Sequence, residues 1–198
     1  QKDVLIKHTI NYAKKSKYIK KIIVSTDNNE TKKFAIKNGA ECPFIRPKKY
    51  SQGDVNLRTV QKFSLKELEK KKIFPDLIVH LEETYPFRDN DLIDNAIKVL
   101  LKNGYDTVIA AKEEKGWLWK ENINGFQRIE EGDIPQKIKK KTYLGLHGIC
   151  CVTYPEFIRE GLLIGKNIGL LPIENHLSVI EIRDQETHRK FSKILKKY

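Results

Sequence analysis

Hydrophobic positions follow two different patterns along the chain. At 4–17 the apolar residues recur every three or four positions, as they do on the buried face of a helix. At 20–26 and 76–81 they form short continuous runs, which are typical of buried strands. The same patterns predict further helices at 28–39, 54–71 and 92–101, after Pro155 and at 185–196, and further strands at 42–45, 107–111, 146–153, 167–173 and 178–182.

This order of elements predicts the fold class. Helices that alternate with non-alternating, buried strands favour an α/β fold, here a doubly wound, mainly parallel sheet of the Rossmann-like type. In such sheets ligands bind at the carboxyl ends of the strands. Residues 113–142 break the rhythm and predict an irregular excursion or a pair of hairpins. The length of 198 residues fits a single domain over 1–198 that contains this excursion.

Composition narrows the function classes. The formal charge is +12, but only seven of the 38 basic residues are arginine, the residue that nucleic-acid readers favour. The lysines therefore predict a solvated basic surface and no specific nucleic-acid partner. No apolar run approaches the roughly 18 residues that span a bilayer, so no membrane partner is expected. Three cysteines, two of them adjacent, indicate buried thiols in a reducing compartment, not disulfides or zinc ligands.

Three motifs at the ends of predicted strands carry a family resemblance. They are IIVSTDNNE at 22–30, KNGAECPFIRP at 37–47 and LIVHLEETYPFR at 77–88. In this order and spacing they resemble the CMP-sialic acid synthetase family, which are cytidylyltransferases of nonulosonic acids. The resemblance implies a nucleotidyltransferase that moves CMP from CTP to a nonulosonic acid and releases pyrophosphate. It also implies Mg²⁺ as cofactor, a homodimer and a cytoplasmic location.

The resemblance begins just after the family's phosphate-binding element. In the family, a first strand and a loop with Gly, Arg and Lys precede the segment that matches Gln1 onward. The sequence is therefore expected to lack the N-terminal strand and phosphate loop of an intact enzyme.

Nucleotide-binding residues are implied at three positions. By resemblance they are Arg46, Asp27 and Asp54. A guanidinium suits phosphate or base recognition because its donors are planar and always charged. The alternatives are a surface salt bridge for Arg46 and a helix-capping turn for the segment that holds Asp27.

Sugar-binding residues are implied at Glu82, Thr84, Tyr85 and His147. Glu82 stands where the family has a glutamine that binds the acid sugar. An ionised glutamate only accepts hydrogen bonds, and it repels a substrate carboxylate unless a cation intervenes. Which acidic sugar is the acceptor therefore stays open. A structural histidine is the alternative for His147.

The segment 178–184 matches a family stretch whose two aspartates hold Mg²⁺. Side chains at i and i+2 of a strand share a face, as a shared metal requires. Glu181 takes the first position and is the implied metal ligand and a catalytic residue, but Arg183 takes the second. Either Glu181 holds the ion with waters and the triphosphate, or Arg183 replaces a cation. Arg88 is the second implied catalytic residue, or it pins its loop through a carboxylate such as Asp91.

The excursion at 113–142 corresponds to the part of the family that builds the dimer. Its Trp117, Trp119 and Phe126 fit an aromatic interface, or they pack over a sheet edge. Two other functions stay open from the sequence. One is a related nucleotidyltransferase with another acidic acceptor, and the other is a non-catalytic protein that binds a nucleotide or a nucleic acid.

Overall fold

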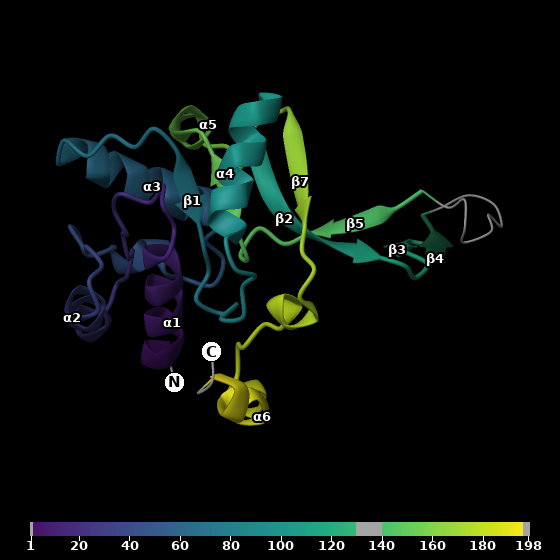
Figure 1. The fold of residues 1–198 in the computed structure, drawn as a ribbon, viewed down its shortest axis with the longest axis horizontal. Coiled ribbons are helices and arrows are strands. Elements are labelled where there is room, and N and C mark those ends of the chain that lie inside the picture. The colour runs from purple at the N-terminus through teal and green to yellow at the C-terminus, as the bar shows by residue number, and fades with distance from the viewer. Residues whose placement is uncertain (1, 130–139, 196–198) are drawn as a thin grey trace.

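The computed structural model describes residues 2–129 and 140–195, and Figure 1 shows how their elements are arranged. The helices are α1 (Lys2–Lys14), α2 (Asn29–Lys37), α3 (Leu57–Lys70), α4 (Leu92–Asn103), α5 (Pro155–Glu160) and α6 (Gln185–Leu195), with 3-10 turns η1 (Lys48–Tyr50) and η2 (His176–Val179). The strands are β1 (Ile78–His80), β2 (Thr107–Glu114), β3 (Trp119–Asn122), β4 (Gly125–Arg128), β5 (Thr142–Gly145), β6 (Cys151–Thr153) and β7 (Ile168–Pro172). The predicted helices are thereby confirmed, with ends that shift by a few residues.

The five-stranded sheet is built around β2. On one edge β7 pairs with β2 in parallel. On the other edge β6 and then β5 pair with β2 in antiparallel, and β1 adds to β6, also in antiparallel. Between β5 and β6 the returning chain leaves the regular ladder, and residues 146–150 form a bulge there.

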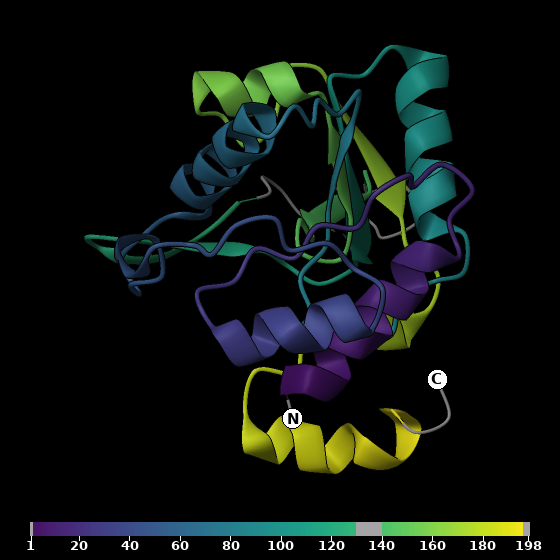
Figure 2. The same ribbon diagram turned by 90° about the vertical axis from the view of Figure 1, so that its left-hand side faces the viewer.

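The expectation of a mainly parallel sheet is wrong, because most neighbouring strands are antiparallel. The physical reason is the excursion after β2: the chain returns from it through β5 and β6 and pairs back on β2 as the second arm of a hairpin does. This reversed strand separates β1 from β2, which still share one direction with β7. The α/β class itself is confirmed, and Figure 2 shows α4 on one side of the sheet with α3 and α5 on the other.

Three predicted strands lie outside the sheet. Residues 20–26 and 42–45 form no ladder, and the single parallel bridge among the described residues of this region joins Ile23 to Glu41, just before the second range. The Val24 N–H donates to the Glu41 carbonyl at 2.9 Å and the Glu41 N–H donates to the Ile22 carbonyl at 2.7 Å. At 178–182 the predicted strand is replaced by the end of η2 and an irregular segment.

The main core lies between α4 and the sheet. The apolar face of α4 buries Leu92, Ile93, Ala96, Ile97 and Leu100 against Val108 and Ala110 of β2 and against Ile149 to Val152. Burying each large side chain of this kind contributes about 1.5–3 kcal/mol. The loop from β1 to α4 therefore starts and ends on well-packed elements, and this loop carries the LEETYPFR motif.

Arg88 fixes that loop from below. Its side chain is 2% exposed. Its Nε donates to the Ile149 carbonyl at 2.6 Å, and its Nη2 donates to the carbonyls of Glu82 at 2.5 Å and Gly148 at 3.2 Å. The guanidinium thus ties the loop to the bulge at 146–150. Burial lowers the pKa of Arg88 to about 10, so it stays charged at neutral pH.

Asp89 fixes the segment that leads to Glu181. Its carboxylate accepts hydrogen bonds from the Glu174 N–H at 3.0 Å and from the Ser178 hydroxyl at 2.7 Å. Its own carbonyl accepts from the Tyr12 hydroxyl at 2.6 Å. Two neighbouring side chains of this loop therefore hold two distant segments in place: Arg88 holds the bulge at 146–150, and Asp89 holds the segment before Glu181.

The excursion forms an arm that projects from the body (Figure 1). Its described part contains the two-stranded sheet of β3 and β4, which confirms one predicted hairpin. Residues 130–139 of the excursion lie outside the described residues. In the part of the chain that the structure describes, no helix is long and apolar enough to cross a membrane.

Replacing Arg88 should destabilise the fold. In Arg88→Met three buried carbonyls lose a charged donor, which we expect to cost about 2–4 kcal/mol of unfolding free energy. Urea unfolding followed by circular dichroism measures the change. The matched control is Arg58→Met on the exposed surface of α3, for which we expect a change within about 0.5 kcal/mol. Equal stability of the two variants would contradict the role of Arg88.

Candidate functional site

The site lies where β1 ends and the bulge at 146–150 begins. The Glu82 N–H donates to the Gly148 carbonyl at 2.8 Å, so loop and bulge are joined by backbone as well as by Arg88. Gly148 also permits a close approach, because a Cβ there would lie 2.7 Å from Glu82 Cδ and 2.9 Å from Tyr85 Cε2. Glycine at this position therefore allows Glu82 and Tyr85 to pack against the bulge.

Two histidines lie beside Glu82. The Nε2 atom of His80 is 3.5 Å from Oε1 of Glu82, and the rings of His80 and His147 have centroids 4.7 Å apart. Burial is the main factor that lowers the pKa of His147 to about 4, and the neighbouring His80 acts in the same direction, so the ring of His147 is neutral at pH 7. The close approach of the His80 side chain is the main factor that lowers the pKa of Glu82, which is therefore ionised.

Glu181 lies on the other side of the same loop. The Ile182 N–H donates to the Thr84 carbonyl at 2.8 Å and brings Glu181 within reach of the Thr84 hydroxyl, which donates to Oε1 at 3.2 Å. Arg183 forms an ion pair with the same carboxylate, with 2.6 Å between Nε and Oε1. Burial and the nearby Glu181 raise the pKa of Tyr85, so its phenol stays protonated.

The predicted strand that would place positions 181 and 183 on one face is not present. Glu181 follows η2 in an irregular segment, and its carboxylate binds Arg183. Asp184 caps the start of α6 instead, because its Oδ1 accepts hydrogen bonds from the N–H and the hydroxyl of Thr187, both at 2.7 Å.

The residues implied for the nucleotide lie elsewhere, in the turn before α2 and in the segment between α2 and α3. Arg46 donates from Nε to the Ser51 hydroxyl at 3.0 Å and from Nη1 to the Ser25 carbonyl at 3.4 Å. Asp27 and Asp54 are exposed in the turns that precede α2 and α3. The helix caps themselves are the neighbouring asparagines: Oδ1 of Asn28 accepts from Glu30 N–H at 2.7 Å, and Oδ1 of Asn56 accepts from Thr59 N–H at 2.9 Å.

The structure thus groups the predicted residues in two sets. Around Gly148 it brings together the residues implied for the sugar and the metal, which are Glu82, Thr84, Tyr85, His147 and Glu181. Arg46, Asp27 and Asp54 are the second set, and they lie before α2 and between α2 and α3. Arg88 lies beneath the first set with its donors on backbone carbonyls, and Asp91 is not among its hydrogen-bond partners within the described residues.

His80 belongs to the first set but was not predicted. It is hidden in the sequence because it lies within an apolar run that predicts a strand. The available signal is its spacing: His80 and Glu82 stand at i and i+2, which places two polar side chains on one face where the strand ends.

Comparison with known proteins identifies the family. The family described as cytidylyltransferase matches residues 2–126, more than half of the chain. N-acylneuraminate cytidylyltransferase A of Danio rerio is 28% identical over 167 residues, which are 81% of this chain and 38% of that protein. Pseudaminic acid cytidylyltransferase of Campylobacter jejuni is 27% identical over 109 residues, 55% of this chain and 47% of that protein. The chain matches less than half the length of either relative.

A solved structure shares the fold. CMP:2-keto-3-deoxy-manno-octonic acid synthetase, solved in complex with CTP, superposes with a TM-score of 0.70 at 10% identity, and the match covers 98% of this chain and 88% of that one. At this identity the likeness concerns the fold, which is the mixed α/β fold of a nucleotidyltransferase. Together with the match over residues 2–126, it shows that the chain belongs to the cytidylyltransferase family.

Proposed function

We propose that the protein transfers CMP from CTP to a nonulosonic acid and releases pyrophosphate. The observation that carries this proposal is the grouping of Glu82, Thr84, Tyr85 and Glu181 at the end of β1, around a bulge that Gly148 keeps open. The relatives named for N-acylneuraminate and pseudaminic acid support the class of acceptor. The acceptor's anomeric hydroxyl oxygen forms the bond to the α-phosphorus, the bond from that phosphorus to the pyrophosphate oxygen breaks, and the hydroxyl proton leaves to solvent.

In this proposal the two sets of residues bind different substrates, one the nucleotide and the other the acceptor. Arg46 binds nucleotide phosphate or base through a guanidinium that Ser25 and Ser51 orient. Asp27 and Asp54 are the other proposed nucleotide-binding residues. On the acceptor side the ionised Glu82 accepts from sugar hydroxyls, while the protonated Tyr85 donates. His147 lines this side as a neutral ring. Catalysis rests mainly on positioning, which for a bimolecular transfer supplies a large part of the rate.

Arg88 contributes to this proposed function by positioning other residues. Its charge is buried under the loop and its donors bind carbonyls, so it is a positioning residue that sets where Glu82 and the bulge lie. Arg183 is exposed and lies beside Glu181, where its charge can face an anionic acceptor.

Magnesium is the expected cofactor because hard phosphate oxygens favour it. The described residues do not form a ready site for it at Glu181, since Arg183 binds that carboxylate and Asp184 caps α6. We therefore propose that Mg²⁺ enters with CTP, and no role given above to a side chain depends on it.

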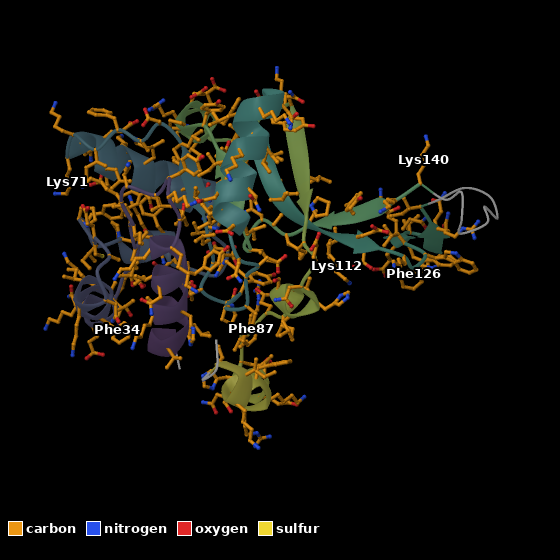
Figure 3. The ribbon with its side chains drawn as sticks, in the orientation of Figure 1. Phe34, Lys71, Phe87, Lys112, Phe126 and Lys140 are labelled. Carbon is orange, nitrogen blue, oxygen red and sulfur yellow. The ribbon has the colours of Figure 1, made fainter. Side chains whose placement is uncertain are left out.

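The arm of β3 and β4 is our proposed dimer contact. Its aromatic side chains are solvent-exposed, with Trp117, Trp119 and Phe126 at 65, 54 and 74%. Figure 3 shows Phe126 on the arm, far from Phe87 in the body. The three cysteines are free and buried, which suits a reducing compartment, and we propose a cytoplasmic location.

The activity is tested with the full-length protein, CTP, Mg²⁺ and a panel of nonulosonic acids. We expect pyrophosphate and a CMP-sugar with at least one acceptor. In Arg46→Met the KM for CTP should rise about tenfold or more, because a charged hydrogen bond is worth about 1.5–3 kcal/mol, while the acceptor KM stays the same. Arg58→Met is the control. Absence of pyrophosphate with every acceptor would refute the proposal.

Gly148→Ala tests the acceptor side. The added Cβ would displace the carboxylate of Glu82 and the ring of Tyr85, so the acceptor KM should rise about tenfold while the KM for CTP stays unchanged. Gly116→Ala is the matched control, since a Cβ there meets nothing within 4 Å. If both variants keep the wild-type acceptor KM, these residues do not bind the acceptor.

The dimer is tested by light scattering after size-exclusion chromatography. We expect Trp119→Ser combined with Phe126→Ser to convert a dimer into a monomer, because aromatic contacts dominate such interfaces. Phe74→Ser removes an aromatic ring that is 64% exposed outside the arm and should leave the dimer intact. A monomeric wild type, or a dimer that survives the double substitution, would rule out this contact.

A further inference from the structure

Two imidazole rings and one carboxylate converge between β1 and the bulge. One potential ligand atom from each of His80, Glu82 and His147 lies within 4.8 Å of those from the other two. The Nε2 atom of His80 and Oε1 of Glu82 are 3.5 Å apart. Two ligands of a tetrahedral Zn²⁺ with bonds of about 2.0–2.1 Å lie about 3.3 Å apart, so this pair is already close to the spacing that a metal imposes.

Most ring nitrogens of this cluster lack a hydrogen-bond partner. Nε2 of His80 and both ring nitrogens of His147 are buried, and none makes a hydrogen bond with the described residues. A buried polar atom without a hydrogen-bond partner destabilises the fold. A bound ion that accepts the lone pairs of two imidazoles would relieve part of this destabilisation.

The carboxylate is held toward the rings. Gly148 leaves the space that this carboxylate occupies, because a Cβ on this glycine would be 2.8 Å from Oε2. Arg88 fixes the backbone carbonyls of Glu82 and Gly148 from below. The three potential metal ligands thus come from β1, from the loop after it and from the bulge. The buried side chain of Arg88 joins the loop to the bulge.

We propose that His80, Glu82 and His147 form a binding site for a first-row transition-metal ion of the Zn²⁺ or Co²⁺ type. Two imidazole nitrogens and one carboxylate oxygen suit such ions, whereas Mg²⁺ prefers oxygen ligands alone. Three protein ligands leave a fourth position for water or for an oxygen of a bound molecule. The side chains of His80 and Glu82 are 21% and 32% exposed, so the ion can reach the site from solvent.

This site is distinct from the Mg²⁺ that accompanies CTP, and its existence does not depend on the transfer reaction. It does share Glu82 with the proposed acceptor side. An occupied site exchanges the negative charge of Glu82 for a net positive charge, which is the condition under which an anionic sugar can lie beside this carboxylate.

The test is metal binding by the chelator-treated full-length protein. We expect one equivalent of Co²⁺ to bind with visible absorption bands of a low-coordinate nitrogen and oxygen site, and Zn²⁺ to displace it. His80→Gln, His147→Gln and Glu82→Gln should each weaken Co²⁺ binding at least about tenfold, the loss that even outer-shell changes produce. Mg²⁺ at equal concentration should neither displace Co²⁺ nor alter its spectrum.

His176→Gln is the matched control, because this imidazole is exposed on η2 and outside the cluster. Far-UV circular dichroism identifies any variant that fails to fold, and the remaining variants then decide. No stoichiometric Co²⁺ binding by the wild type would overturn the proposal, and so would wild-type affinity in folded variants of His80 and His147. The transfer assay is run separately, so either proposal can fail while the other stands.

Discussion

The buried guanidinium of Arg88 is the contact on which the site depends. It binds carbonyls of the loop after β1 and of the bulge in the returning strand, two segments that no regular sheet ladder joins at this point. Planar, permanently charged donors can serve several carbonyls at once, which a lysine cannot do with one ammonium in the same fixed geometry. The neighbouring Asp89 extends the same principle to the segment before Glu181, so one loop fixes three parts of the site.

Charge within the site is mixed and closely arranged. Glu82 faces two histidines, and Glu181 faces Arg183, so each carboxylate has a specific nitrogen-bearing neighbour. The overall charge of +12 contributes little to this arrangement, because it comes mostly from lysines on the surface. The charge at the site is therefore set by these few local pairs.

Local patterns in the sequence predicted the helices well, because apolar periodicity and capping residues such as Asn28 act over short distances. They also predicted that Glu82, Thr84 and Tyr85 share a loop. They failed where distant segments decide the outcome: strand direction depends on how the chain returns from the arm, and 20–26 finds no sheet partner among the described residues. His80 was missed, and the carboxylate suggested as the alternative partner of Arg88 was wrong, because only the fold brings the bulge to them.

The bulge at 146–150 also determines which position of this site can be substituted without changing the backbone. Its position is fixed by backbone carbonyls and by glycine at 148, while the side chain at 147 takes no part in the ladder between β2 and its partners. The side chain at 147 can therefore vary without disturbing strand register. The scaffold separates the position of this side chain from the residues that hold the backbone.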